Sequence, residues 1–525
     1  MMRTRPWAAL VASVVLFVSP AGPLAAQQPV PVQLSPYLGL FATHDKLYDE
    51  LGMVAEYDTS LFRLYMDLSL INDGKYEPEE PLPRGYDFNL RQGTVELNYR
   101  PLSLLAGRTP HSDEIDSPYS MFISSWEIPA MVVSFNYDDS FFFYETRWIS
   151  LNQNPKWYRT PEPIYPYEDY PSSPPIFDPD DPPAPGDPDD PDVYYRPLDR
   201  GANYKVYGIR LGDWRLGMQE SVVYINQTFY PEYFFSPLPM FFTQLVNSSA
   251  GKPWTQIDDE NSHVGFFVDV TRPHYYAYLQ FLMGDFNLGA FVPGSDYRHP
   301  HKLGWSLGGA RDFSFGRLGL YHAGALKYTF AATSANSENY SMKRYEYTYY
   351  PAVEYLFDGE PRALDYRDNY IGYLYGENNL AFMATYEGDV NDYWVEGSAE
   401  FVVSGSKSPA NPWHEYRGHP GRYGSDRVVH LLDESPLEKT VRVSSSIGRS
   451  FGRWDLKASA MIGAVFNELE VVPVEQPEDD DPHQDFDNQP GLYKPSNDNR
   501  LLFEFFIGAR YNFAIHPSQR EAAAR

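Results

Sequence analysis

Residues 453–467 read RWDLKASAMIGAVFN, and an apolar side chain recurs at every second position from Trp454 to Phe466. The positions between them begin with Asp455 and Lys457, so the second face of the segment carries charges of both signs. A period of two residues is that of a β-strand, whose successive side chains point to opposite faces. A tilted strand crosses a bilayer with about 9–11 residues, and this segment is long enough to do so.

The same alternation recurs in residues 61–70, 92–100, 393–404 and 501–513. It would also suit a soluble β-sandwich. However, long strands with a charged second face and with Tyr, Phe or Trp at the ends of the apolar face are typical of transmembrane barrels. The sequence therefore predicts an all-β fold, a single antiparallel transmembrane β-barrel with its apolar faces turned outward to lipid.

The connections between these segments alternate between short and long. Eight short ones contain the Gly, Asp, Asn, Ser or Pro of tight turns and lie at 58–60, 100–101, 138–139, 212–213, 271–274, 315–316, 388–392 and 451–452. The long ones lie at 73–87, 110–128, 153–202, 227–262, 287–303, 332–377, 406–437 and 468–498, after a short first one near 45–50. Outer-membrane barrels have short periplasmic turns and longer extracellular loops. Eight turns between nine hairpins predict about 18 strands, with 16 as the alternative.

The N-terminus has the layout of a secretory signal peptide. Arg3 and Arg5 precede an apolar run over 7–18, and small residues precede Gln27. A short apolar core between a basic start and small residues is read by the export machinery and then cleaved. The predicted organisation is a signal peptide over 1–26, a periplasmic lead over 27–35, the outer-membrane barrel over 36–515 and a C-terminal tail over 516–525.

Composition excludes several classes of protein. The 525 residues include no cysteine and carry a formal net charge of −29. Without cysteine there is no disulfide framework, thiolate metal site or lipoprotein anchor. The acidic balance argues against nucleic acid as a partner, because phosphate binding needs a basic surface.

Two of the long connections, 153–202 and 468–498, are rich in Asp and Glu, and the first is also rich in Pro. We interpret them as solvated, extended acidic loops. The alternative is weak loop-bound Ca²⁺, since hard cations take carboxylate oxygens, but no D-x-D-x-D-G spacing is present. The sequence predicts no metal site and no cofactor.

Catalytic motifs occur only in unsuitable contexts. Residues 304–308 match G-x-S-x-G but lie in an alternating strand, whereas the hydrolase motif needs a strand, a sharp turn and a helix. His414 and His419 are five residues apart, so a helix would not bring them to one metal at the i, i+4 spacing. His299 and His301 lack a third ligand nearby. We therefore expect no enzymatic activity.

The last predicted strand contains Gly508, Tyr511 and Phe513 in the pattern G-x-x-Y-x-F. This pattern resembles the C-terminal signal read by the outer-membrane assembly machinery. The expected partners of the barrel are therefore this machinery and outer-membrane lipid.

A family resemblance follows from a set of short motifs. They are LAGR at 105–108, QESVVY at 219–224, PEYFFSPL at 231–238, DDEN at 258–261, FVDV at 267–270 and YLQFLMGD at 278–285. In this order they resemble the Wzi-type capsule-assembly barrels of Gram-negative outer membranes and their uncharacterised relatives, over roughly 95–330. The resemblance implies an 18-stranded barrel that binds surface polysaccharide. It also implies six candidates for polar contacts to a ligand or plug: Arg108, Glu220, Tyr224, Glu232, Asn261 and Asp269.

The polar faces of the strands would line a wet lumen. The charged residues expected there are Arg63, Asp67, Glu96, Arg100, Glu145, Arg147, Glu396, Glu400, Arg442, Asp455, Lys457, Glu504 and Arg510. Charges of both signs would set up a transverse field across a pore. The leading hypothesis is an integral outer-membrane barrel without catalytic activity that binds or helps to display surface polysaccharide. The alternatives are a porin for small polar or cationic solutes, and a secreted soluble β-rich enzyme.

Overall fold

The computed structural model describes residues 30–74, 82–125, 128–151, 200–225, 228–247, 260–285, 300–331, 355–357, 360–362, 371–407, 429–472 and 492–515. Several predictions fall outside these ranges. They are the signal peptide, the tail 516–525, most of both acidic connections, His299, His414 and His419.

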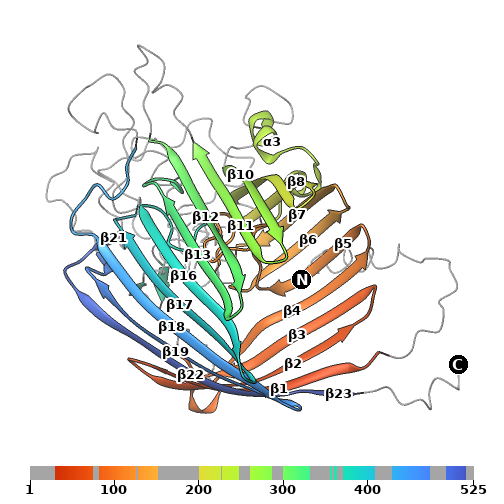
Figure 1. Cartoon of the computed structure of the whole chain (residues 1–525). Helices are drawn as coiled ribbons and strands as arrows, with labels where there is room; N and C mark the ends of the chain where they lie inside the picture. The colour runs from red at the N-terminus through yellow and green to blue at the C-terminus, as the bar shows by residue number, and fades with distance from the viewer. Residues whose placement is uncertain are drawn as a thin grey trace, which may run out of the picture.

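Long antiparallel strands make up most of the described chain (Figure 1). They are β1 (Val32–Thr43), β2 (Leu47–Asp58), β3 (Phe62–Ile71), β4 (Asp87–Tyr99), β5 (Leu102–Thr109), β6 (Ala130–Asp138), β7 (Phe142–Ser150), β8 (Arg200–Leu211), β9 (Trp214–Ile225), β10 (Glu260–Arg272), β11 (Tyr275–Asp285), β12 (Lys302–Phe313), β13 (Gly316–Ala325), β16 (Asn379–Val390), β17 (Tyr393–Ser404), β18 (Glu438–Phe451), β19 (Trp454–Phe466) and β22 (Asn499–Tyr511).

Shorter elements lie in the connections or at the C-terminus. They are a 3-10 turn (Pro83–Gly85), α2 (Pro231–Phe235), α3 (Met240–Asn247), the hairpins β14 (Tyr355–Phe357) with β15 (Glu360–Arg362) and β20 (Leu469–Val472) with β21 (Leu492–Pro495), and β23 (Phe513–Ile515). In the described part of the chain, no helix has both the length and the hydropathy required to cross a membrane.

The strands close into a barrel because β1 pairs with both β2 and β22. β23 continues β22 along β1 in the same register, so the 19 segments of the main sheet form 18 barrel strands. The predicted count of 18 is confirmed, and all eight predicted tight turns join consecutive strands. The predicted strand 393–404 has the bounds of β17. Closure satisfies every edge, which a bilayer demands because hydrocarbon offers no hydrogen-bond partner.

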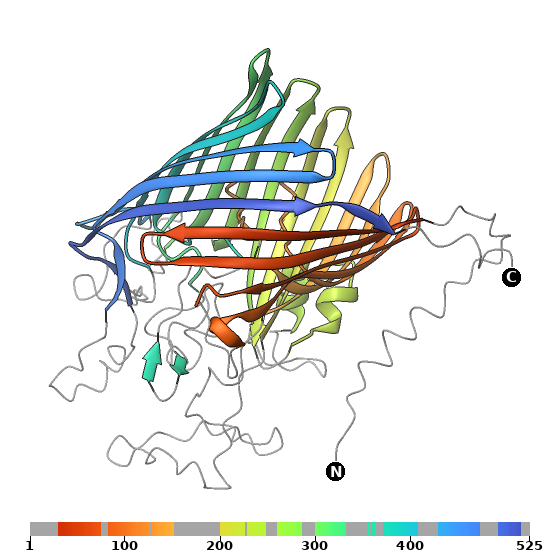
Figure 2. The same cartoon turned by 90° about the horizontal axis from the view of Figure 1, so that it is seen from below.

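The alternating pattern sorts side chains between the two surfaces of the barrel wall. On β19, Leu456 and Ile462 are exposed on the outside, whereas Asp455 and Lys457 line an internal cavity. The sheet curves round this interior in the view from below (Figure 2). The wall therefore has the apolar exterior and polar interior of an outer-membrane barrel.

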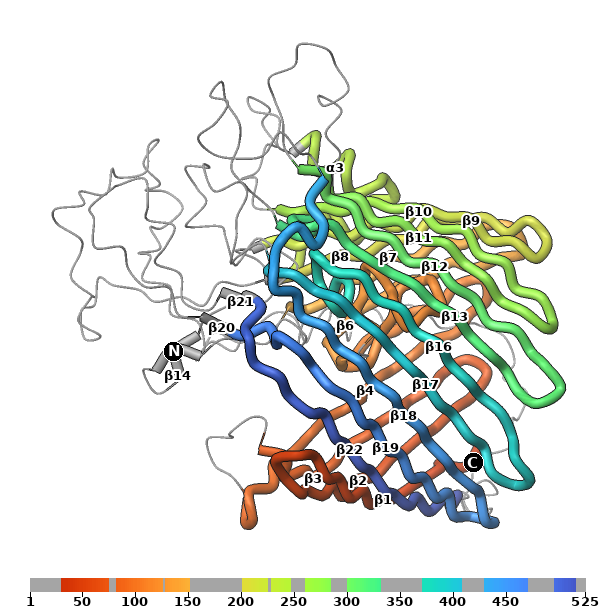
Figure 3. Tube along the Cα trace, turned by 60° about the vertical axis from the view of Figure 1, so that its left-hand side comes forward, coloured from red at the N-terminus to blue at the C-terminus, as the bar shows by residue number. Residues whose placement is uncertain are grey.

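The two ends of the barrel differ. The tight turns gather at one end, and the strand ends that lead into the long connections lie at the other, together with α3, β20 and β21 (Figure 3). Two connections depart from the sequence expectation of plain loops. Residues 110–125 fold into the lumen, and residues 228–247 contain the two short helices. Neither has the long periodic pattern that would have indicated it.

Gly107 on β5 allows a close approach between strands. Its φ is 141°, and a Cβ there would lie 2.1 Å from the carbonyl oxygen of Gly93. We predict that Gly107→Ala lowers the free energy of unfolding by about 2 kcal/mol or more, because both the backbone conformation and the contact become strained.

The turn residue Gly212 is a matched control, since its φ is 65° and nothing lies within 4 Å of a Cβ there. Gly212→Ala should cost about 1 kcal/mol. Denaturant unfolding in detergent, followed by tryptophan fluorescence, measures both, and equal losses would contradict this explanation.

Candidate functional site

Residues 110–125, here called the inward segment, leave the end of β5 and enter the lumen. Five of their apolar side chains are at most 2% exposed: Ile115, Tyr119, Met121, Phe122 and Ile123. They belong to the largest buried cluster, together with wall residues such as Tyr204 on β8 and Tyr278 on β11. The core of this protein therefore lies inside the barrel, between the inward segment and one side of the wall.

Asp113 organises the fold of the inward segment. Its carboxylate accepts hydrogen bonds from the backbone N–H of Ile115 at 3.1 Å and of Met121 and Phe122 at 3.2 Å. Gln280 of β11 donates a fourth bond at 2.9 Å. Burial raises the pKa of Asp113 against the opposing effect of these bonds. A buried carboxyl group with this many donors holds the segment in one conformation and ties it to the wall.

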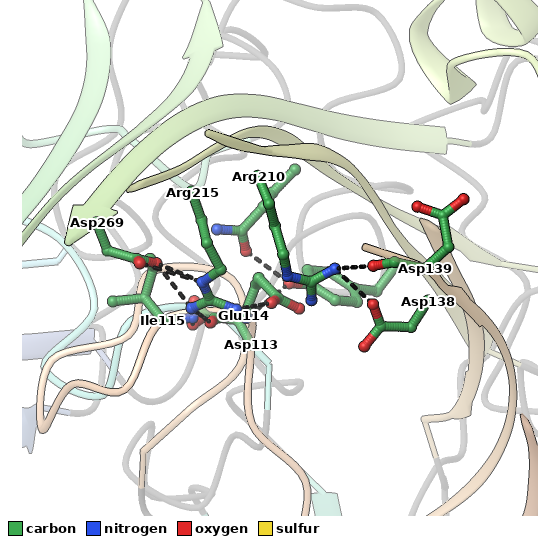
Figure 4. A network of polar contacts seen from close by, with 10 residues as sticks. Asp113, Glu114, Ile115, Asp138, Asp139, Arg210, Arg215 and Asp269 are labelled. Carbon is green, nitrogen blue, oxygen red and sulfur yellow. Dashed lines mark hydrogen bonds and ion pairs between the residues drawn. The ribbon is translucent and has the colours of Figure 1, made fainter. Parts of the chain in front are cut away.

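An arginine of the wall holds the next residue (Figure 4). Arg215 on β9 donates to the carboxylate of Glu114 and to that of Asp269 at 2.7 Å. Asp269 lies opposite Arg215 in the register of β9 and β10 and is 1% exposed. Burial raises the pKa of Glu114 to about 7, although Arg215 acts to lower it. Two carboxylates thus share one guanidinium, one from the wall and one from the inward segment.

A second arginine anchors the start of the segment. Arg147 on β7 donates to the carbonyl oxygen of Ser112 at 2.7 Å and forms an ion pair with Glu145 at 2.7 Å. Its guanidinium also lies 3.1 Å from Nδ1 of His111. Burial, with Arg147 beside it, holds the pKa of His111 well below its usual range. His111 is therefore neutral, and its Nδ1 can accept this bond.

The inward segment also reaches the far wall. The hydroxyl of Tyr119 donates to Glu400 on β17 at 2.9 Å, and that of Tyr375 donates to the same oxygen at 2.7 Å. Glu400 forms an ion pair with Arg442 on β18 at 2.8 Å. The N–H of Gly372 donates to the carbonyl oxygen of Phe122 at 2.8 Å, so residues beyond β13 meet the segment inside the barrel.

The remaining lumen is a cavity of about 1090 Å³. Its wall comes chiefly from β1–β3 and β16–β22, with Pro118 and Ser125 of the inward segment facing it. Five acidic and four basic side chains line it: Glu50, Asp67, Glu400, Asp455 and Glu504, with Arg91, Arg442, Lys457 and Arg510. Serines of β17, β18 and β19 add neutral hydroxyls: Ser398, Ser444, Ser446, Ser450 and Ser459. The cavity carries many charged and hydroxyl groups, and its charges are close to balanced.

Several of its cations are held over aromatic rings. The ammonium of Lys457 lies 5.1 Å from the ring centroid of Trp394, and the guanidinium of Arg510 lies 5.8 Å from that of Tyr37. Tyr37 also donates to Asp67 at 2.8 Å. Such contacts attract the long cationic side chains to the ring faces.

The structure places the residues that the sequence assigned to the lumen in three groups. Seven line the cavity: Asp67, Glu400, Arg442, Asp455, Lys457, Glu504 and Arg510. Glu145 and Arg147 contact or adjoin the inward segment, and Arg63, Glu96 and Glu396 alternate with outward apolar neighbours. Arg100 is a correction, because β4 ends at Tyr99 and Arg100 forms the tight turn with Pro101.

The six candidates from the family resemblance are dispersed. Asp269 holds the inward segment through Arg215, and Asn261 lies opposite Val223 on the inner face. Glu220 and Tyr224 face the outside, where residues 228–247 cover them. Glu232 is in the first turn of α2. Arg108 lies opposite Met131 on the outward face of β5, and its role as a ligand contact stays a prediction.

The C-terminal pattern lies where β22 and β23 pair with β1. Gly508 faces the cavity, and the ring centroid of Tyr511 lies 4.9 Å from that of Trp454 and 6.1 Å from that of Phe513 on the outer surface. The role of these residues in assembly stays a prediction.

The G-x-S-x-G stretch lies within β12, and the hydroxyl of Ser306 is 2.9 Å from that of Tyr278. It lacks the strand–turn–helix setting of a nucleophile elbow. Within the described ranges, no three His, Cys, Asp or Glu side chains are grouped so as to hold a metal ion. The expectation of no enzymatic activity stays a prediction.

No family model matches the sequence, and no curated protein matches it. Among solved structures, the chain is similar to OccK2 (OpdF) of Pseudomonas aeruginosa, with 8% identity, a TM-score of 0.41 and coverage of 93% of this chain and 98% of that one. It is similar to OccAB4 of Acinetobacter baumannii, with 10% identity, a TM-score of 0.39 and coverage of 93% and 99%. It is also similar to outer-membrane-expressed OmpT of Vibrio cholerae, with 9% identity, a TM-score of 0.32 and coverage of 93% and 99%. At these scores the likeness carries no argument about function, and the Wzi-type resemblance stays a prediction.

We predict that Asp113→Ala loosens the inward segment. The backbone N–H groups of Ile115 and Phe122 would lose their acceptor, whereas that of Met121 keeps the side-chain oxygen of Gln280 at 3.2 Å. Each such loss in a buried site costs about 1–3 kcal/mol. Hydrogen exchange of residues 110–125 should become at least about tenfold faster than in the unaltered protein. Asp116→Ala is the matched control, because Asp116 is on the same segment but exposed. Equal exchange in the two variants would contradict the role of Asp113.

The raised pKa of Glu114 makes the anchoring of the segment depend on pH. Between its ordinary pKa of 4.5 and about 7, the folded protein holds the proton more tightly than the unfolded chain does. The contribution of Glu114 to the stability of the folded protein is therefore fully present below about pH 4.5 and is lost as the pH rises through 7. We predict that protection of residues 110–125, corrected for intrinsic exchange, falls more between pH 5 and pH 8 in the unaltered protein than in Glu114→Gln. Asp113 and His111 titrate in both proteins, so parallel pH profiles would contradict a Glu114 contribution.

Proposed function

We propose that the protein is a porin-like channel of the outer membrane that passes small polar solutes through the lumen cavity. The observation that carries this proposal is the extent of the cavity. Its lining includes Thr43 and Tyr48 beside the connection at 44–46, and Ser450 and Asp455 beside the turn at 452–453. These pairs lie at opposite ends of the strands, so the cavity follows the wall from one end of the barrel to the other.

The chemistry of the lining supports small hydrophilic solutes. Serine hydroxyls accept and donate hydrogen bonds without a net charge, and the nearly balanced ionic groups do not favour strong ion selectivity. Four of the charges form two ion pairs at 2.7 and 2.8 Å: Arg91 with Glu50, and Arg442 with Glu400. We infer a weak preference for cations, because the lining has one acidic group more than basic groups and the chain as a whole is acidic.

An outer-membrane location agrees with the apolar exterior of the barrel and with the aromatic side chains near the tight turns. Trp214 on β9, Phe315 beside β13 and Trp454 on β19 are exposed there. Aromatic residues at this level mark the membrane interface of barrels. Export by an N-terminal signal peptide is part of the same proposal.

Surface-polysaccharide binding is the less favoured function. The motifs that suggested it lie in 105–108 and 219–285, and among the described residues of those ranges none lines the cavity. Those residues build the wall, hold the inward segment, or carry the helices outside the barrel. A glycan site on the connections would instead give an inserted barrel with little conductance.

Planar bilayer recordings on the refolded full chain test the channel directly. We expect a stable conductance proportional to voltage, with a reversal potential in a salt gradient that indicates weak cation preference. Insertion of correctly folded barrels without conductance would overturn the proposal and would favour the glycan function.

We predict that Lys457→Gln increases cation preference. A unit charge about 10 Å from a passing ion in water contributes about 0.4 kcal/mol, which is roughly a twofold change in relative permeability. Lys439→Gln is the matched control, because it removes the same charge from a residue on the outward face of β18. Reversal potentials of the two variants should differ. An identical shift in both would mean that the ions do not pass Lys457.

A further inference from the structure

Residues 228–247, here called the flap, lie against the outer surface of the barrel wall. The lumen-facing residues Arg147, Tyr204 and Gln219 contact the inward segment or one another. Their chain neighbours therefore face outward, and these are the residues that the flap covers: Thr146, Trp148, Asn203, Lys205 and Glu220. The flap includes α2 and α3, and α3 lies near β10 at the end with the long connections (Figure 1).

Polar groups on the outside of the wall fasten the flap. The carboxylate of Glu220 accepts hydrogen bonds from the N–H of Met240 at 2.8 Å and of Phe241 at 3.2 Å, at the first turn of α3. The ammonium of Lys205 donates to the carbonyl oxygens of Ser236 and Leu238. Glu220 thus satisfies the free N–H groups of the helix and stands at the positive end of its dipole.

Further bonds run along the flap. Thr146 donates to the carbonyl oxygen of Phe234 at 2.9 Å, Tyr207 to that of Pro237 at 3.2 Å and Trp148 to that of Thr228 at 2.6 Å. Beneath the flap lies a small apolar cluster that is separate from the core in the lumen. Its members are Val222, Tyr224, Tyr230, Tyr233 and Met240, each at most 3% exposed.

Two charged residues beneath the flap would otherwise face the lipid. Lys205 and Glu220 lie opposite each other in the register, about halfway along β8 and β9. A Lys or Arg at mid-depth on a lipid-facing barrel surface costs about 2–4 kcal/mol. The flap removes both groups from the outside and satisfies them with backbone partners.

The outer face of the flap is apolar. Six large side chains are 42–69% exposed: Phe235, Leu238, Phe241, Phe242, Leu245 and Val246. Glu232 is the one charged residue within 228–247, although 22% of the whole chain is charged. The six residues continue the exposed apolar surface of the neighbouring strands at Leu216 and Phe266.

We propose that the acyl chains of the outer leaflet cover this face, so that the flap lies within the membrane as part of the lipid-facing surface of the barrel. Three observations carry the assignment: the continuity with the exterior of β9 and β10, the near absence of charge, and the sealing of Lys205 and Glu220 beneath. The long connections mark the extracellular end, which places the flap in the outer leaflet. The proposal is independent of whether the lumen conducts.

The absence of native cysteine permits single-site spin labelling. Phe242→Cys and Leu245→Cys, each carrying a nitroxide, are reconstituted as the full chain in lipid vesicles. Accessibility to oxygen, which concentrates in acyl chains, is compared with accessibility to a water-soluble nickel chelate. Phe266→Cys is the control for the lipid-facing wall, and Asp45→Cys, in the connection at 44–46 with a side chain 68% exposed, is the control for water at the same end.

We expect both flap labels to match Phe266→Cys, with high oxygen and low nickel accessibility. Nickel accessibility equal to that of Asp45→Cys at both positions would overturn the proposal, because the flap would then lie in water. Exclusion of both reagents together with dipolar broadening between labels would also overturn it, in favour of a second copy of the chain on this face. The heat-dependent gel mobility of folded barrels establishes that each labelled variant is folded, and either position alone is sufficient for the test.

Discussion

Continuous backbone hydrogen bonding around 18 strands is the constraint from which the other features of this protein follow. Hydrocarbon cannot satisfy an open edge, so the sheet must close. Closure gives every strand one face toward lipid and one toward the lumen, and the two-residue period of the sequence distributes side chains accordingly. The polar interior is therefore a consequence of the same pattern that makes the exterior apolar.

A barrel of this width would have a wide lumen, and the inward segment reduces it. The segment is held by buried groups that need partners in order to be tolerated. Asp113 has four donors, and Glu114 shares Arg215 with Asp269. Leaving any of these carboxylates without its donors would be costly in a dry environment. The arrangement therefore favours one conformation, in which one side of the barrel is packed and the other keeps a polar passage.

The flap applies the same principle outside the barrel. Lys205 and Glu220 break the apolar pattern of the outward faces, and the chain compensates by laying an apolar-faced helix over them. Around β7–β10, the inward segment packs on the lumen surface of the wall and the flap packs on the outer surface. This part of the barrel is thus the thickest, and the passage lies on the opposite side.

The strands were predictable because their pattern is local and repeated. Alternation located residues 393–404 as a strand, and Gly, Asp and Pro located the tight turns. The inward segment was not predicted, because its contacts with Arg215, Gln280 and Glu400 join residues more than 100 positions apart. A signal was present, since residues 119–123 read YSMFI, which is apolar for a loop in water.

The flap had a comparable signal in the scarcity of charge over 228–247, which the acidic composition of the chain makes unusual. Arg108 was assigned as a ligand or plug contact on a resemblance alone, and the register of β5 places it on the outward face. Arg100 was assigned by extending an alternating pattern one residue into a turn. In both cases the strand ends and the register, which depend on pairing partners, decide the outcome.

The central claim is that residues 110–125 are seated in the lumen against β11 and β12. The hydroxyl oxygens of Ser117 and Ser306 are 3.4 Å apart, and the chain has no other thiol to interfere. The most direct measurement is therefore oxidation of the double variant Ser117→Cys with Ser306→Cys in the folded protein. We predict rapid formation of a disulfide in this pair and none in the control pair Ser117→Cys with Ser444→Cys, whose second residue lines the cavity on β18. Two free thiols in the first pair, both still reactive toward a maleimide, would contradict the account.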